Sequence, residues 1–399
     1  MENLSERIKN MANSATLAMT QKSRDLQSQG INVINLSIGE PDFATPDYVK
    51  EAAKKAIDDN YTHYPPVPGY GSLQNAISQK FKRENNLDFE PNQIVVSNGA
   101  KHSIANVILS IIGPGDEVIV PAPYWVSYPD LIILAEGKPV FVECEIEQNF
   151  KMTAKQLENA ITSKTKAIIF SSPSNPTGNL YSKQELKELA DVLSKKENEK
   201  IIIISDEIYE HINFVGKHES IAQFNEIKDR VVVVNGVSKG YAMTGWRIGY
   251  IGAPLWLAKA VTKLQGQFTS GACTIAQKAS EAALNGGMEV VNQMTGVFKK
   301  RRDLVYDLLK EIPGLKINLP DGAFYFFPDV SSFFGKSYEN YNIKTSSDLA
   351  LFLLDKAHVA TVGGDAFGAP KCLRLSYATS EDLLKKAVAD IKEALTLLK

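Results

Sequence analysis

Short runs of aliphatic and β-branched residues alternate with longer amphipathic stretches through the middle of this chain. The apolar runs are Ile94–Val96, Glu117–Val120, Pro139–Val142, Ala167–Phe170, Ile201–Ile204, Val231–Val234 and Ile248–Ile251. Helix-like segments lie between most of them, at Lys101–Ile112, Tyr124–Ala135, Thr153–Ala160 and Lys183–Lys196. Strands that alternate with helices indicate βαβ units, in which helices cover both faces of a mostly parallel sheet. The pattern therefore predicts an α/β fold for this region.

The pattern changes around Gly286-Gly287. A long helical stretch over Val290–Leu309 precedes shorter, mixed strand and helix signals. Ser346–Lys356 and Ser380–Leu398 each begin with a serine suited to a helix N-cap. We therefore expect three parts: an N-terminal segment, 1–45, that packs with the small domain, a large domain, 46–288, and a smaller C-terminal α+β domain, 289–399.

Composition narrows the class of protein. The chain has 399 residues, of which 44% are hydrophobic and 23% charged, and its formal net charge is -2. These values are typical of an enzyme-sized globular protein and favour neither nucleic acid nor membrane as a partner. The three cysteines suggest no disulfide framework, and the five histidines lack metal-ligand spacing, so no metal is expected. The chain begins without a secretory signal pattern, which predicts a cytoplasmic protein.

Three of the apolar runs lead directly into polar residues. Asn175 follows the run that ends at Phe170, Asp206 and Tyr209 follow the one that ends at Ile204, and Lys239 follows Val231–Val234. Open α/β sheets bind ligands beyond the carboxyl ends of their strands. If these strands are neighbours, the four side chains converge in one crevice. Each also has a structural alternative: a plain turn at Asn175, for example, or a helix N-cap at Asp206.

Lys239 lies in a turn rich in small residues, Gly236–Gly245, immediately after a buried strand. Poor solvation lowers the pKa of an amine, and a neutral amine can form a Schiff base with a carbonyl. Arg247, eight positions later, carries a permanent charge that suits a phosphate. An ordinary surface lysine is the alternative.

A second anion site is expected where the run Ile94–Val96 meets the next helix. Gly99 and Ala100 let the backbone approach a ligand closely, and the helix N-terminus favours negative charge. The chain has no P-loop, and Gly69–Gln74 lacks the third glycine of a dinucleotide fingerprint. A phosphate-bearing ligand other than a nucleotide is therefore favoured.

Together these motifs resemble a known family. Asn175-Pro176-Thr177-Gly178, Asp206-Glu207-Ile208-Tyr209, Ser238-Lys239 with Arg247, and Arg374-Leu375-Ser376 occur in the order seen in class I pyridoxal-phosphate-dependent aminotransferases of fold type I. The likeness runs from about Ser14 to the last helix. It implies a large cofactor-binding domain with a mostly parallel sheet, a smaller α+β domain, and a homodimer with shared active sites.

The resemblance also implies a role for each matching residue. Lys239 would form the Schiff base with pyridoxal 5′-phosphate, Asp206 would pair with the pyridine nitrogen, and Asn175 and Tyr209 would bond O3′. The other cofactor-binding residues would be Arg247, Ser238, Gly99, Ala100 and Lys101 at the phosphate and Trp125 on the ring, with Tyr64 reaching the phosphate from the neighbouring subunit. Tyr70 is a weaker match for that tyrosine.

Substrate residues follow in the same way. Arg374 would hold the α-carboxylate, helped by Gly39, Trp125 and Asn175. Ser14, Thr16 and Lys101 match the aspartate aminotransferase subgroup that binds the distal carboxylate without a second arginine. The resemblance thus implies amino transfer from L-aspartate to 2-oxoglutarate. A prephenate or broad-specificity aromatic aminotransferase, and a C–S lyase on the same fold, remain alternatives.

Overall fold

A seven-stranded sheet forms the centre of the computed structural model, which describes residues 3–12 and 15–399. Its strands are β2 (Ile94–Ser97), β3 (Glu117–Ala122), β4 (Lys138–Glu143), β5 (Thr165–Ser171), β6 (Ile202–Asp206), β7 (Val231–Gly236) and β8 (Gly249–Gly252). All seven apolar runs predicted from the sequence are therefore strands. The order is β2-β8-β7-β6-β5-β3-β4, and only β8 runs antiparallel to its neighbours. The prediction of a mostly parallel sheet is confirmed.

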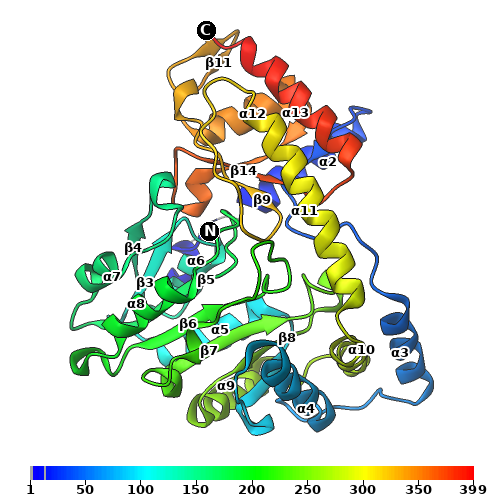
Figure 1. Cartoon of the computed structure of the whole chain (residues 1–399), viewed down its shortest axis with the longest axis vertical. Coiled ribbons are helices and arrows are strands. Elements are labelled where there is room, and N and C mark those ends of the chain that lie inside the picture. The colour runs from blue at the N-terminus through cyan, green and yellow to red at the C-terminus, as the bar shows by residue number, and fades with distance from the viewer. Residues whose placement is uncertain (1–2, 13–14) are drawn as a thin grey trace.

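Helices cover both faces of this sheet (Figure 1). One face packs against α5 (Ala100–Ile111), α6 (Ser127–Leu134) and α9 (Leu255–Phe268). The other packs against α3 (Asp47–Asp58), α4 (Gly71–Lys80), α7 (Ala154–Ala160), α8 (Lys183–Leu193) and α10 (Thr274–Asn285). Successive strand residues point to opposite faces, so Ile203 joins one core and Ile202 and Ile204 join the other. Burial on both faces explains why these strands read as continuous apolar runs.

The C-terminal part is built on α11 (Glu289–Leu309), α12 (Ser346–Lys356) and α13 (Glu381–Thr396). A small antiparallel sheet, in the order β13 (Val362–Gly363), β14 (Leu373–Ser376), β9 (Tyr325–Phe326), lies among them, with a hairpin of β10 (Ser337–Tyr338) and β11 (Tyr341–Asn342). The N-terminal segment contributes α1 (Glu6–Lys9), α2 (Ala15–Ser28) and β1 (Ile34–Asn35), which pairs in parallel with β12 (Val359–Ala360). The three-part domain division stays a prediction.

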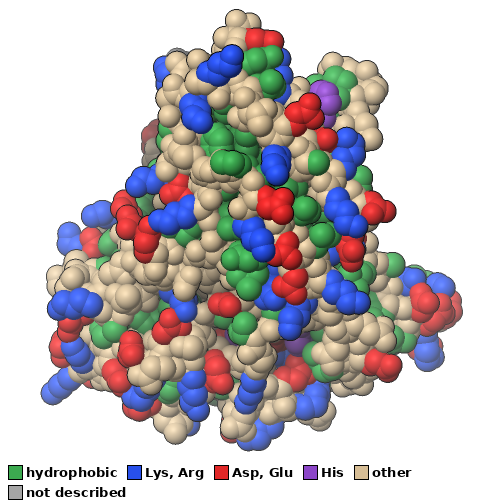
Figure 2. Space-filling model, turned by 45° about the horizontal axis from the view of Figure 1, so that its top comes forward, with side chains coloured by type: hydrophobic (Ala, Val, Ile, Leu, Met, Phe, Trp, Pro, Cys, Tyr) green, Lys and Arg blue, Asp and Glu red, His purple; other side chains and the backbone are tan. Residues whose placement is uncertain are grey.

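Short helical turns complete the chain. They are a π-helical turn at Phe81–Asn85 and 3-10 turns at Pro91–Gln93, Ile146–Gln148, Lys196–Asn198, Ile221–Gln223, Lys228–Arg230, Thr244–Trp246, Ser331–Phe333 and Gly364–Phe367. On the face drawn in Figure 2, basic and acidic side chains are interspersed. None of the helices in the described ranges is both long and apolar enough to cross a membrane.

Two local expectations need correction. The helix expected from Tyr124 begins at Ser127, because the Tyr124 N–H is bonded to the Phe367 carbonyl. The N-cap expected at Ser346 is Thr345, whose hydroxyl accepts a hydrogen bond from the Asp348 N–H. Ser346 Oγ instead donates to Asp365. The N-cap at Ser380 is confirmed.

Candidate functional site

A cavity of about 650 Å³ opens at the carboxyl edge of the large sheet, where that sheet faces the C-terminal part. Because β5, β6 and β7 are neighbours, the residues that follow them lie side by side there. The expected site residues that line the cavity are Gly39, Ala100, Lys101, Trp125, Asn175, Asp206, Tyr209, Ser238, Lys239, Arg247 and Arg374. The structure therefore brings together residues that are up to 335 positions apart (Gly39 to Arg374).

Two expected tyrosines do not line the cavity of their own chain, and two further expected residues cannot be placed. Tyr64 is 95% exposed and does not line the cavity of its own chain. Tyr70, the weaker candidate, packs edge-on against Tyr61. Ser14 and the side chain of Thr16 lie outside the described residues, so their expected role at a distal carboxylate stays a prediction.

Lys239 lies at the centre of the cavity. Its Nζ donates a 2.6 Å hydrogen bond to the Gly39 carbonyl and lies 5.7 Å from the centroid of the Tyr209 ring. Burial lowers the pKa of Lys239 to about 8. A substantial fraction of the amine is therefore neutral near physiological pH, as nucleophilic attack on a carbonyl requires.

Asp206 ends β6 and points into the same cavity. Tyr128 on α6 donates a 2.6 Å hydrogen bond to its Oδ2, and the Ile208 N–H donates to Oδ1 at 3.3 Å. Burial raises the pKa of Asp206 to about 6, and these bonds oppose the rise. No helix begins at Asp206, which excludes the N-cap interpretation.

Arg374 holds a buried guanidinium at the opposite wall. It donates to Asn175 Oδ1 at 2.9 Å and to the Ser37 carbonyl at 2.6 Å, whereas its buried Nε has no protein partner. The Tyr325 and Phe367 rings lie 4.8 and 4.9 Å from it. Two of its five N–H donors are thus used for orientation, and the others are available to a carboxylate. Asn175 has a tertiary role beyond that of a plain turn.

Arg247 and Gly99 form a close contact at the N-terminus of α5. Arg247 donates to the Thr244 carbonyl at 2.9 Å, which fixes the guanidinium against the backbone of Gly99. A Cβ at position 99 would collide with that guanidinium, and Gly99 has φ +87°, which favours glycine. The guanidinium and the helix N-terminus together form an anion site.

Lys101 is the fourth cation of the cavity. Its Nζ lies 5.0 Å from the centroid of the Trp125 ring, and burial together with Arg247 lowers its pKa. In the described chain, Lys101, Lys239, Arg247 and Arg374 form no ion pair with a carboxylate. The three carboxylates of the cavity wall have other bonds: Asp130 accepts from the Ala12 N–H at 3.1 Å, Asp206 from Tyr128, and Asp365 from Ser347 Oγ at 2.7 Å. The four cations of the cavity are therefore available to an anionic ligand.

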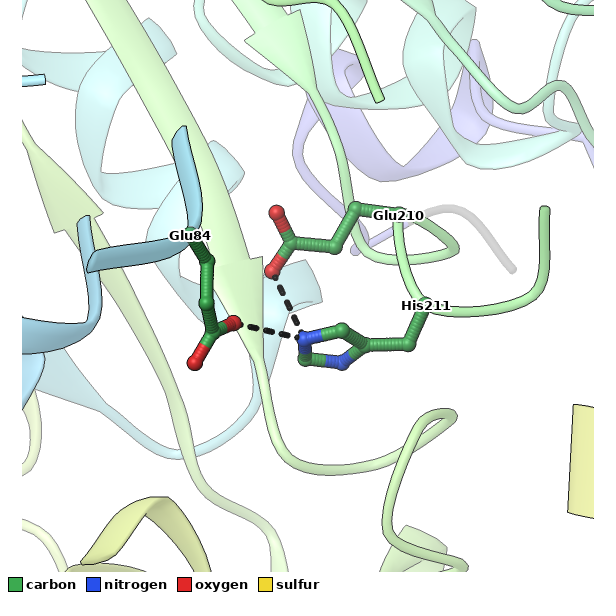
Figure 3. Close-up of side chains that lie close together, drawn as sticks. All are labelled: Glu84, Glu210 and His211. Carbon is green, nitrogen blue, oxygen red and sulfur yellow. Dashed lines mark hydrogen bonds and ion pairs between the residues drawn. The ribbon is translucent and has the colours of Figure 1, made fainter. Parts of the chain in front are cut away.

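Behind this wall, the loop after Asp206 enters a buried charge network. Glu210 accepts from Asn85 at 2.8 Å, and His211 Nε2 lies 2.9 Å from Glu84 and 3.5 Å from Glu210 (Figure 3). Two groups of side chains here have the spacing of metal ligands. They are Glu84, Glu210 and His211, and Glu207, Glu210 and His218. The buried ammonium of Lys80 already pairs with Glu210 and Glu84, which supplies the positive charge that these carboxylates need. The expectation of no metal stays a prediction.

Among the residues of the cavity wall that sequence reasoning missed are two tyrosines, Tyr128 and Tyr325. Tyr325 Oη lies 2.7 Å from Tyr209 Oη, and Tyr128 bonds Asp206. Neither tyrosine belongs to a motif that the sequence analysis identified. The aromatic run Phe324–Phe327 was a possible signal of a buried strand, but it does not indicate which ring faces the cavity.

Known proteins resemble this chain over its whole length. Residues 31–391 match the family described as aminotransferase class I and II. The aspartate/prephenate aminotransferase of Nitrosomonas europaea is 46% identical, over 98% of this chain and 100% of the relative.

Solved structures agree with that match. An aspartate aminotransferase from Rhizobium meliloti is 42% identical with a TM-score of 0.96, covering 100% of both chains. The Thermus thermophilus aspartate aminotransferase with maleate is 39% identical with a TM-score of 0.92, covering 99% of this chain and 100% of that one. The match to the family spans most of the chain, and the chain therefore belongs to the aminotransferase class I and II family.

Proposed function

We propose that this enzyme transfers the amino group of L-aspartate to 2-oxoglutarate, giving oxaloacetate and L-glutamate. The observation that carries the proposal is the set of four cations in one cavity that lack a carboxylate partner in the described chain. A cofactor phosphate and the two carboxylates of a dicarboxylic substrate are three anionic groups that would match them.

Enzymes of this family depend on pyridoxal phosphate, and the cavity fits that group. The absence of a Cβ at Gly99 lets the Arg247 guanidinium lie against the N-terminus of α5, where it would bind the phosphate, and Ser238, Ala100 and Lys101 line the same cavity. Asp206 would pair with the pyridine nitrogen, Asn175 and Tyr209 would bond O3′, and Trp125 would cover the ring. When bound, the cofactor supplies an electron sink for the carbanion formed at the substrate Cα.

The chain's own residues account for the remaining chemistry. Arg374 binds and orients the substrate α-carboxylate with Asn175 and Gly39, which fixes the Cα–H bond relative to the cofactor ring. Lys239, as a free amine, would take the proton from the substrate Cα and hold it for return as a general acid. The pKa of about 8 keeps that amine close to the pH at which it must both accept and release a proton.

The second substrate carboxylate is assigned to Lys101, with Ser14 and Thr16. The Thermus relative binds maleate, a dicarboxylate, and the Nitrosomonas relative acts on aspartate and prephenate by name. Prephenate also carries two carboxylates, so the same cations suit it and it is the second candidate substrate. A C–S lyase would need neither Lys101 nor a keto-acid acceptor.

A half-reaction panel tests the proposal. The purified holoenzyme is mixed with single amino acids while the visible absorbance of the cofactor is followed, and oxo acids are then added to restore it. We expect aspartate and glutamate to change the visible absorbance of the cofactor, and we expect 2-oxoglutarate to restore it. Release of ammonia and pyruvate from a β-substituted amino acid, with no reaction of aspartate, would refute amino transfer.

Lys101→Ala should discriminate between dicarboxylic and aromatic substrates. We expect kcat/KM for aspartate to fall by about 10- to 100-fold, the range for loss of a charge-assisted bond, and kcat/KM for phenylalanine to fall by less than about threefold. Steady-state kinetics with both substrates on the same preparation provide the internal control. Equal losses for the two substrates would contradict the assignment of Lys101.

We further propose a homodimer in the cytoplasm, in which the partner subunit's Tyr64 reaches the cofactor phosphate. An aromatic ring that is 95% exposed is unusual in a lone chain, and Ile57, Trp256 and Phe268 are also more than half exposed. Sedimentation equilibrium should give a dimer, and Tyr64→Phe should weaken retention of pyridoxal phosphate. Tyr306→Phe on α11 is the control, because Tyr306 does not line the cavity. A monomer with full activity would refute this arrangement.

A further inference from the structure

Tyr325 connects residues of the cavity that come from different parts of the chain. It is fully buried on β9, beside the strand β14 that carries Arg374. It lines the cavity, and its hydroxyl is the nearest atom to the position that a Cβ on Gly39 would take, at 2.5 Å. Gly39 in turn accepts the Lys239 bond. No motif of the sequence assigned Tyr325 a role.

The hydroxyl and the ring of Tyr325 make separate contacts. The hydroxyl lies 2.7 Å from Tyr209 Oη, whereas the centre of the ring lies 4.8 Å from the Arg374 guanidinium, which also contacts Phe367. Phenylalanine at position 325 would keep the ring contact with Arg374 and remove only the hydrogen bond. The two roles can therefore be tested independently.

The direction of the Tyr209–Tyr325 bond follows from the number of protons. A phenol has one O–H donor. If Tyr209 donates that proton to the cofactor O3′, as the proposed function requires, its oxygen can only accept from Tyr325. A chain of two hydrogen bonds polarises each member, so the Tyr325 bond makes Tyr209 a stronger donor to O3′.

The charges that face Tyr209 are compatible with this arrangement. They are the Lys239 ammonium, which faces its ring, the Arg374 guanidinium and the Asp206 carboxylate. Burial raises the pKa of Tyr209 and of Tyr325, so both phenols keep their protons at neutral pH.

We propose that Tyr325 is a positioning residue whose hydroxyl donates to Tyr209 and thereby lowers the pH at which the lysine–cofactor chromophore titrates. Donation to O3′ stabilises its anionic form and disfavours the protonated chromophore. The proposal rests on the proposed role of Tyr209, and it adds a residue of the C-terminal part to the control of cofactor acidity.

The test is a pH titration of the visible absorbance of the holoenzyme without substrate. Tyr325→Phe should raise the titration midpoint by a few tenths of a pH unit, because it removes only the polarisation of the Tyr209 bond and not that bond itself. Tyr209→Phe should raise it by at least as much, and the double variant should add no further rise. Tyr377→Phe is the matched control. It removes another buried hydroxyl of the C-terminal part, bonded to the Ala323 carbonyl at 3.0 Å, and should leave the midpoint unchanged.

The outcomes separate this proposal from the proposed function. An unchanged midpoint in Tyr325→Phe, or an undiminished rise when it is added to Tyr209→Phe, would overturn the role of Tyr325. Neither measurement involves aspartate, so the substrate assignment is unaffected by them. Failure of aspartate in the half-reaction panel would refute the substrate and leave the titration result standing.

Discussion

Replacing Lys239 by alanine is expected to abolish amino transfer, lowering kcat by roughly 10⁴-fold or more. The reason is that the proposed function gives one amine two tasks, which are to bind the cofactor covalently and to move the proton at the substrate Cα. No other lysine of the described chain lies as close to the Gly39 carbonyl and the Tyr209 ring. Activity with aspartate and 2-oxoglutarate is the measurement, and added pyridoxal phosphate should not restore it.

The same variant should keep its fold. The unfolding temperature of the apoprotein is the control, because the cofactor does not contribute to it. The pKa of Lys239 is lowered from 10.5 to about 8, so the unfolded chain binds this proton more tightly than the folded chain. The protonated lysine therefore destabilises the fold at and below pH 8, and the cost disappears as the pH approaches 10.5.

Apo Lys239→Ala should accordingly unfold at the same or a higher temperature than the apo wild type at pH 7. The difference between the two unfolding temperatures should shrink as the pH approaches 10. Lys217→Ala, at an exposed loop lysine, should change neither activity nor stability. Retention of more than about a hundredth of wild-type kcat by Lys239→Ala would exclude the assigned role.

Replacing Arg374 by lysine should reduce kcat/KM for aspartate by about 100-fold or more. Lysine keeps the charge but not the planar fork that binds a carboxylate through two parallel bonds. It also loses the bonds to Asn175 and Ser37 and the packing between Tyr325 and Phe367. The cofactor absorbance without substrate should remain, because the proposed role of Arg374 is to bind the substrate carboxylate and not the cofactor phosphate.

A loss of packing alone would produce a different pattern. Arg302 is also buried, stacks 4.8 Å from Phe214 and donates to the Pro320 carbonyl at 3.0 Å, but it does not line the cavity. Arg302→Lys should lower the unfolding temperature and leave kcat/KM within about threefold of the wild type. If both variants lose activity in proportion to stability, the carboxylate role of Arg374 is wrong.

Much of the large sheet was predictable because its strands are buried on both faces. Burial on both faces demands apolar residues at every position, and that demand is visible in the runs that became β2 to β8. The order of the strands was not predictable from those runs. Only hydrogen-bond pairing places β5, β6 and β7 side by side, and only pairing makes β8 antiparallel.

The residues of the cavity likewise differ in how far the sequence could predict them. Asp206, Asn175 and Lys239 were identifiable because each ends a strand or follows one within a few residues, and Arg247 because it shares the small-residue turn region of Lys239, in local sequence that suits its chemistry. Tyr128 and Tyr325 were not, because their partners lie 78 and 116 positions away and nothing local requires a tyrosine. The sequence by itself therefore determined the family and the type of reaction, and it predicted the cofactor lysine. The tertiary structure alone decided which phenols bond Asp206 and Tyr209 and which cations of the described cavity have no carboxylate partner, because hydrogen bonds and charge balance depend on distances in space that no sequence spacing specifies.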